Sequence, residues 1–403
     1  MPLKLFHLFI YFLLFTCCKT YSQISFSDSL FRLGVPNSVK LSSSVFVDYY
    51  YKAHGDSLVR GIGVNQYSGI PPDRNAFAFR RIFLGFDYNI SKKFVAELLL
   101  ASEDHLNVTT FNGNVSNTGD LLTNNKFAFY VKRANLRWKN IFKGTDLAFG
   151  EVTTPSFFLL TQQIWAYRSL EKTIADIRKT PSTDLGVTIQ SHLGSKDNFG
   201  FNIMVANGTS SRPENDAHKW IYGDFYAKFF NKKLVIDVYG DYTKIDWTKT
   251  FHHSRNMLKG MIAYNTPQLT LGAEAFINHG KNDVVGLSAN KKDTLNSNAT
   301  CVSVYVHGNI INERLRYVLR YDFYNPNTKY DKNKYESYKG FSSAYEPSNN
   351  EHLLIAGIDY AITKDIHILP NIWYTKYNNK QYTPTSSDHD LVYRLTLSYA
   401  FGK

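Results

Sequence analysis

Apolar and polar residues alternate with a period of two along most of this 403-residue chain. The alternation is clearest in residues 391–401, where Leu395 and Leu397 share one face and Arg394 and Thr396 share the other. Successive side chains of a β-strand point to opposite faces, so each such segment is predicted to be a strand with one apolar and one polar face.

Sixteen segments carry this pattern, and the connections between them alternate in length. The predicted strands cover residues 38–51, 75–89, 92–102, 126–138, 145–152, 183–192, 198–207, 219–230, 233–243, 257–266, 269–278, 301–310, 314–324, 352–361, 365–377 and 391–401. Between them lie eight long loops, which are residues 52–74, 103–125, 153–182, 208–218, 244–256, 279–300, 325–351 and 378–390. The remaining seven connections are tight turns such as Ile90–Ser91.

Long loops on one side and short turns on the other are typical of a transmembrane β-barrel. A secreted sandwich of two packed sheets, the alternative all-β fold, leaves this sorting of the loops unexplained.

A membrane barrel also accounts for the composition. One face of each strand meets lipid and needs apolar residues, while the other face meets water and accepts charge. The chain is 43% hydrophobic and rich in Tyr and Phe, which gather at the predicted strand ends as membrane-interface girdles. We therefore predict an all-β, transmembrane antiparallel β-barrel of about 16 strands, a size that leaves an aqueous channel.

The first 22 residues have the pattern of a secretory signal peptide. Lys4 precedes a short apolar run, and small or polar residues follow up to Ser22. We predict cleavage after Ser22, with residues 23–403 forming one barrel domain. Cleavage would lower the formal net charge from +12 to +10 and would leave Cys301 without another cysteine to pair with.

The third long loop, residues 153–182, is the longest and differs from the others. Residues 162–179 have helical periodicity, with one apolar face made of Ile164, Tyr167, Leu170, Ile174 and Ile177. Arg168, Lys172 and Lys179 share another face. An amphipathic segment must pack its apolar side against something, so we predict that it folds inward and narrows the channel with its basic face. The alternative is a cap on the barrel rim.

Three stretches of this chain resemble the phosphate-selective porin family, the O and P type outer-membrane porins. They are Arg80–Phe86 with Lys92–Leu98, Arg133–Leu136 with Phe149–Pro155, and Leu170–Glu171 with Thr183–Val187. The resemblance implies a sixteen-stranded barrel, a homotrimer, an inward third loop and passive diffusion of small anions.

Charged residues on the predicted inner face have both signs. The candidate constriction and anion-binding residues are Arg168, Lys172, Arg178, Lys179, Arg133 and Arg137, with Arg81, Arg316, Arg320 and Arg394 elsewhere on the inner face. The same face carries Asp87, Glu97, Asp224, Asp237, Asp241, Glu274, Asp322 and Asp359. Most of these charges are expected to pair across strands, at about 0.2–1 kcal/mol for each pair.

Other functions find little support in the sequence. The pair His252–His253 and the run Asp388–Asp390 fall in predicted loops, without the spacing of a metal or catalytic motif, and are read as solvated. Gly61–Gly63 does not follow a strand and open a helix, so it is not a nucleotide-binding loop. Basic residues are dispersed along an exported chain, which disfavours nucleic-acid binding. No enzyme activity, cofactor or metal is therefore predicted.

The sequence as a whole predicts a porin in the outer membrane of a Gram-negative bacterium. Its expected partners are small anionic or polar solutes such as phosphate, the membrane lipid and lipopolysaccharide, and two further copies of itself. The alternative is a barrel with a blocked lumen that acts as an adhesin or a structural protein.

Overall fold

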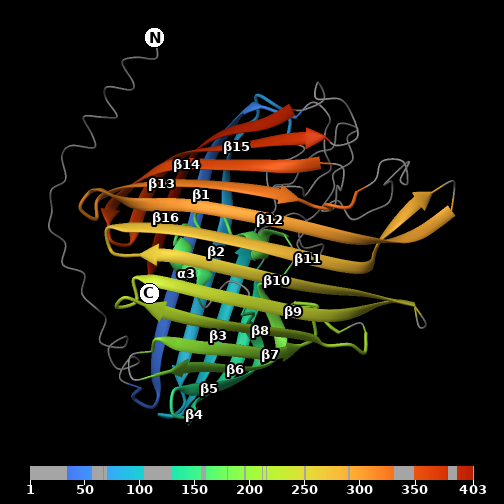
Figure 1. Ribbon diagram of the computed structural model, residues 1–403. Coiled ribbons are helices and arrows are strands. Elements are labelled where there is room, and N and C mark those ends of the chain that lie inside the picture. The colour runs from blue at the N-terminus through green and yellow to red at the C-terminus, as the bar shows by residue number, and fades with distance from the viewer. Residues whose placement is uncertain are drawn as a thin grey trace.

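The computed structural model forms one closed barrel of sixteen antiparallel strands (Figure 1). The structure describes residues 34–56, 67, 70–103, 129–155, 160–178, 180–194, 197–210, 212–214, 216–248, 251–288, 291–330, 349–379 and 388–402. The predicted signal peptide, residues 1–22, and the Gly61–Gly63 loop lie outside these residues.

All sixteen predicted strands are present, which confirms the predicted fold class. They are β1 (Ser38–His54), β2 (Asn75–Asn89), β3 (Phe94–Glu103), β4 (Tyr130–Phe142), β5 (Thr145–Thr153), β6 (Thr183–Leu193), β7 (Phe199–Ala206), β8 (Trp220–Phe229), β9 (Leu234–Thr248), β10 (Phe251–Asn265), β11 (Leu269–Ser288), β12 (Lys291–Ile311), β13 (Leu315–Asn325), β14 (Asn349–Thr363), β15 (Ile366–Asn379) and β16 (Asp388–Phe401). Each strand pairs with its neighbours in sequence, and β1 pairs with β16 from Ser43↔Phe401 to His54↔Leu391. The sheet thus has no free edge, as a strand structure in lipid requires.

The alternation of the sequence becomes two chemically distinct surfaces. In β13, Leu319 and Tyr321 are 44% and 38% exposed on the outer face, whereas Arg320 and Asp322 are 1% and 4% exposed on the inner face. Large apolar side chains are exposed on strand after strand around the barrel, which is the surface that lipid covers in a membrane barrel. Among the residues that the structure describes, no helix is both long and apolar enough to cross a membrane.

Two bulges bring extra cations to the inner face. In the β1–β2 ladder Phe46 pairs with Arg81 and Val47 pairs with Phe79, so Arg80 is the additional residue. Both Arg80 and Arg81 are consequently buried on the inside. A second irregularity in the β3–β4 ladder skips Lys132 in the same way and turns it inward beside Arg133.

The structure corrects two predicted loops. Residues 244–256 and 279–300 were expected to be loops, but they largely extend the hairpins β9–β10 and β11–β12, and the second hairpin projects beyond the barrel in Figure 1. Antiparallel pairing satisfies the backbone N–H and C=O groups whatever the side chains are, in water as well as in lipid. A strand can therefore continue beyond the point where the apolar alternation ends. For the same reason Asp388–Asp390, expected in a loop, begin β16.

Candidate pore constriction

The segment between β5 and β6 begins and ends at one point of the barrel. The backbone N–H of Thr154 donates to the carbonyl of Ser182 at 3.1 Å, and the Thr154 hydroxyl donates to the carbonyl of Pro181 at 2.7 Å. These two bonds hold the first and last residues of the loop side by side, as in a β-hairpin. We call the described residues 160–178 inside it the third-loop segment.

The third-loop segment holds two short helices and not the single helix predicted for residues 162–179. These are α3 (Thr161–Trp165) and α4 (Ile174–Arg178). Ala166 adopts a left-handed backbone conformation, with φ of 60°, and ends α3. Arg80 and Arg394 donate to the carbonyl of Leu170 at 2.8 and 3.2 Å. Side chains of the barrel wall therefore bind a carbonyl that a continuous helix would have bonded internally.

Contacts of the segment reach opposite walls of the barrel. Arg80 lies on β2, and Lys259, whose Nζ donates to the Thr161 hydroxyl at 3.5 Å, lies on β10. These two strands are halfway around the closed strand order from each other. Figure 1 shows α3 enclosed by the strands. The segment thus touches inward-facing side chains on both sides of the lumen.

Apolar packing holds both halves of the segment. Ile164, Trp165 and Leu170 belong to a buried cluster with Tyr305 on β12 and Trp373 on β15. In a second cluster Ile174 and Ala175 of α4 pack with wall residues, among them Met204, Tyr239 and Met257. Burying a large apolar side chain contributes about 1.5–3 kcal/mol, so the segment is anchored well beyond the strength of its hydrogen bonds alone.

Two of the predicted anion-binding residues are sealed beneath the segment. Arg320 donates to the carbonyl of Lys172 at 2.6 Å and lies over the Trp165 ring at 4.9 Å. Arg394 lies over the Trp373 ring at the same distance, and its side chain is 0% exposed. Arg320 is also paired with Asp322 at 2.7 Å. These guanidinium groups act as anchors for the segment and are shielded from water.

A different set of predicted residues remains in contact with water. Arg168 and Lys172 of the segment are 16% and 20% exposed, and Arg133 and Arg137 on β4 are each 17% exposed. Arg168 pairs with Asp176 at 2.8 Å. On the wall, Arg133 lies 3.5 Å from Asp87, and Arg137 lies 3.0 Å from Glu97. The expected pairing of inner-face charges is present here.

The remaining predicted residues have mixed placements. Arg81 pairs with Glu103 at 3.3 Å and donates to the carbonyl of Arg168 at 3.1 Å. Arg316 lies over the Tyr167 ring at 5.9 Å and 3.5 Å from His307 Nδ1. The Arg178 side chain and Lys179 lie outside the described residues.

Several charged residues of this site were missed in the sequence. They are Asp48, Lys52, Arg80, Glu103, Lys132, Glu171 and Asp176. A signal existed for two of them, because the adjacent cations Arg80–Arg81 and Lys132–Arg133 can both face the lumen only across a bulge. The acids on the segment had no such signal, since their role depends on how the loop folds.

Asp176 links the charges of the segment. Its side chain is 1% exposed and pairs with Arg168, while the hydroxyl of Ser182 donates to it at 2.6 Å. Burial opposes its ionisation, but Lys172, Arg168 and Lys132 outweigh burial and lower the pKa of Asp176 to about 2. The ionised carboxylate therefore stabilises the docked segment.

The segment should accordingly loosen in acid. An unfolded Asp has a pKa of about 3.9, so the stabilisation by Asp176, about 2 kcal/mol, is complete above that pH and is lost as the pH falls toward about 2. The amides of Ile177 and Thr180 donate to the carbonyls of Thr173 and Ala175 at 3.0 and 3.2 Å. We expect faster hydrogen exchange of these two amides, corrected for the intrinsic rate, at about pH 2.5 than at neutral pH. Asp176→Asn should exchange fast at both values, and a variant that behaves like the wild type would contradict this role.

Comparisons with known proteins agree with the fold. No protein-family model matches the sequence, and no curated protein sequence matches it either. Among solved structures, the outer-membrane channel DcaP of Acinetobacter baumannii matches with a TM-score of 0.60 and 12% identity, over 91% of this chain and 98% of that one. An anion-selective porin from Comamonas acidovorans matches with a TM-score of 0.57 and 11% identity, over 91% and 100%. OmpT of Vibrio cholerae matches with 0.55 and 11%, over 91% and 98%.

At these identities the likeness is one of fold. The chain shares the sixteen-stranded architecture of outer-membrane porins, and its outer face is apolar around the barrel. A closed barrel with an apolar outer face is the form in which β-strands cross a membrane, so the chain has the architecture of a multi-pass transmembrane β-barrel.

Proposed function

We propose that this protein is a porin, a passive diffusion channel for small hydrophilic solutes, with a preference for anions such as phosphate. The observation that carries the proposal is the third-loop segment, which reaches from β2 to β10 and keeps Arg168 and Lys172 in contact with water. A narrowed, charged passage inside a barrel is how a porin selects by size and charge. The resemblance to phosphate-selective porins remains a prediction.

The distribution of exposure suggests where the passage runs. Charged side chains on β3 and β4 keep contact with water, with Glu97 at 15% and Arg137 at 17% exposed. Those under the segment, such as Lys259 and Arg320, are 0% and 1% exposed. We place the path between the β3–β4 wall and the edge of the segment that carries Arg168 and Lys172.

Anion preference follows from the chemistry of this path. Guanidinium groups bind phosphate oxygens through two parallel hydrogen bonds, so Arg133, Arg137 and Arg168 suit an oxyanion. Each of them also faces a carboxylate within 4.0 Å. The paired acids weaken the field of the cations, so the expected selectivity is modest and the binding of any one anion is brief.

The test is single-channel conductance in a planar bilayer, with the reversal potential measured across a salt gradient. The wild type should open in steps and favour anions modestly, and Arg168→Gln combined with Lys172→Gln should bring the anion-to-cation permeability ratio close to unity. Lys364→Gln is the matched control, because Lys364 is 62% exposed in a short turn at the other end of the strands. A cation-selective wild-type channel would reject the anion preference while leaving a channel in place.

One observation also favours a barrel that does not transport solutes. Apolar clusters pack against both α3 and α4, and such packing is also what a permanently blocked lumen requires. A barrel of this kind would act as an adhesin or as a structural protein through its loops. Absence of conductance from a correctly folded barrel would favour this function over transport.

We also propose that the barrel assembles as a homotrimer and that lipopolysaccharide contacts its long-loop end. One solved form of the similar OmpT of Vibrio cholerae is a trimer. The formal net charge of +10 that remains after the predicted cleavage favours contact with the phosphates of lipopolysaccharide.

A further inference from the structure

Three side chains from three separate segments meet at the long-loop end of the barrel. His218 precedes β8, Asp246 lies near the end of β9, and His252 lies at the start of β10. His218 Nε2 is 3.0 Å from Asp246 Oδ1, and His252 Nδ1 makes a hydrogen bond to the same oxygen. We call these residues the rim cluster.

The two imidazole rings of the rim cluster converge on one point. A ring nitrogen bonds within the plane of its ring, and both nitrogens here are directed at a single carboxylate oxygen. The ring planes are 87° apart with centroids 5.2 Å apart, so the two groups approach that oxygen from different directions. The three candidate ligand atoms all lie within 4.8 Å of one another.

This arrangement is close to what one metal ion requires. Zinc binds imidazole nitrogen at about 2.0–2.1 Å and carboxylate oxygen at about 2.0–2.2 Å. An ion bound in both ring planes would take the place where Asp246 Oδ1 now lies, and a rotation of the Asp246 side chain would keep that oxygen as a third ligand. The side chains of His218, Asp246 and His252 are 29%, 30% and 41% exposed, so they are free to make this adjustment.

We propose that the rim cluster binds a divalent transition-metal ion of the zinc class. Two imidazoles and one carboxylate suit such an ion, whereas Ca²⁺ and Mg²⁺ require mainly oxygen ligands. Three protein ligands leave one tetrahedral position for water. The bound ion would fasten the segment before β8 to the β9–β10 hairpin at the mouth of the barrel.

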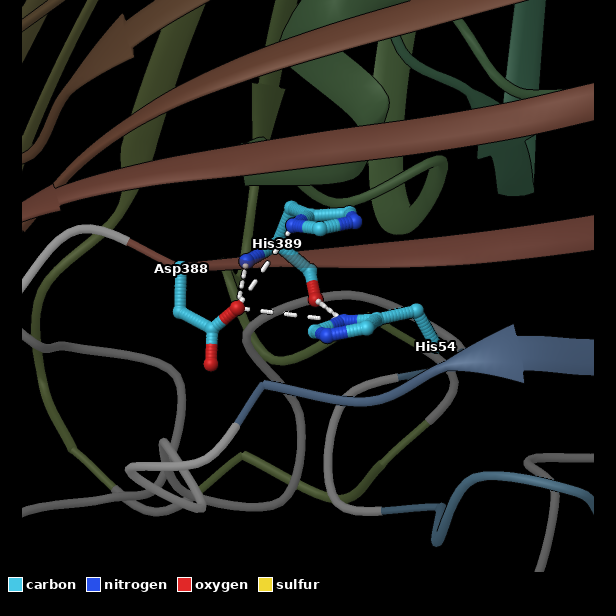
Figure 2. A group of neighbouring side chains, drawn as sticks. All are labelled: His54, Asp388 and His389. Atoms are coloured by element: carbon cyan, nitrogen blue, oxygen red, sulfur yellow. Dashed lines mark hydrogen bonds and ion pairs between the residues drawn. The ribbon is translucent and has the colours of Figure 1, made fainter.

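A second group of similar composition serves as an internal comparison. His54, Asp388 and His389 lie where β1 meets β16 (Figure 2). Their two rings are stacked, with centroids 3.9 Å apart and planes 5° from parallel, and His54 Nδ1 contacts the carbonyl of His389 at 2.8 Å. An ion cannot lie in two parallel ring planes at once, so this group needs a ring rotation before it can bind. We therefore assign the metal to the rim cluster.

The experiment uses the full-length barrel in detergent. Calorimetric titration with Zn²⁺ should show one equivalent bound, and Co²⁺ should give the visible absorption of a tetrahedral site. Loss of an outer partner alone weakens metal sites about 10- to 100-fold, so His218→Ala and His252→Ala should each weaken Zn²⁺ binding by at least about tenfold. The double variant His54→Ala with His389→Ala, which removes the stacked pair, should bind Zn²⁺ like the wild type.

Two further variants protect the test against misfolding. His218→Gln retains a donor for Asp246 but offers only an amide, a poor zinc ligand, and Asp246→Asn retains the shape of the carboxylate. Both should lose Zn²⁺ while circular dichroism still reports a folded barrel. A wild type that binds no stoichiometric Zn²⁺ would overturn the proposal, as would loss of binding in the stacked-pair variant but not in His218→Ala. Conductance is read separately, so this result is independent of the proposed transport.

Discussion

Replacing residues 155–181 with a two-residue Asn-Gly turn is expected to raise single-channel conductance several-fold and to weaken ion selectivity. Thr154 already bonds to Ser182, so β5 and β6 should close as a hairpin once the loop is removed. The deletion removes the segment that contacts both β2 and β10 across the lumen, together with Arg168 and Lys172. Conductance depends on the narrowest part of a water-filled pore, and that part is expected to disappear.

The matched control shortens a different hairpin. Val284 and Leu295 pair near the tip of β11–β12, which projects beyond the barrel, so replacing the residues between them by a tight turn should leave conductance unchanged. Both variants must first show the circular dichroism of a folded barrel. If the deletion of the third loop left conductance low, the segment would not be the constriction. The buried residues Tyr67 and Ile70 of the β1–β2 loop, which belong to the same apolar cluster as Trp165, would then be the next candidates.

The barrel was predictable because lipid imposes a simple rule on every strand. Leu319 and Tyr321 must face outward and Arg320 inward whatever the rest of the chain does, so a local pattern is sufficient. A bulge breaks this rule, because its one additional residue lets two consecutive side chains face inward. Arg80 is invisible to a strict period of two, because its inward direction depends on the register of β2 against β1.

The third loop shows where local pattern and tertiary structure separate. Its helical spacing correctly marked Ile164, Tyr167, Leu170 and Ile174 as buried. The same spacing was wrong about one continuous helix, because guanidinium groups from β2 and β16 bind the Leu170 carbonyl. Those partners are distant in sequence, and no local periodicity can report them.

In the candidate site too, the local sequence pattern predicted the face of a residue but not its tertiary contacts. Parity assigned Arg320 and Arg394 to the inner face, but it could not say that the segment covers them. The rim cluster is the extreme case, since His218, Asp246 and His252 come from three segments and have no motif spacing. The sequence favoured a solvated His252, and only the fold reveals its partners.

Replacing Asp48 with alanine is expected to lower the free energy of unfolding by about 3–5 kcal/mol. Asp48 is 2% exposed on β1, and its carboxylate lies 2.8 Å from Arg80 Nε and 4.0 Å from Arg394 Nη1. The hydroxyl of Thr396 also donates to it at 2.6 Å. Its loss would leave two buried guanidinium groups without their shared counter-charge, and both of them hold the Leu170 carbonyl of the third-loop segment.

The measurement is urea unfolding of the refolded barrel in lipid vesicles, with Asp365→Ala as the control. Asp365 is 43% exposed and pairs with Lys364 at 3.9 Å, so its loss should cost no more than about 1 kcal/mol. If Asp48→Ala cost as little, the carbonyl of Leu170 and the aromatic rings would be sufficient to compensate the buried arginines. A large cost in Asp48→Ala, together with flickering conductance, would instead mean that the charge on β1 keeps the third-loop segment in place. The stability of the wall and the width of the pore would then depend on the same buried carboxylate.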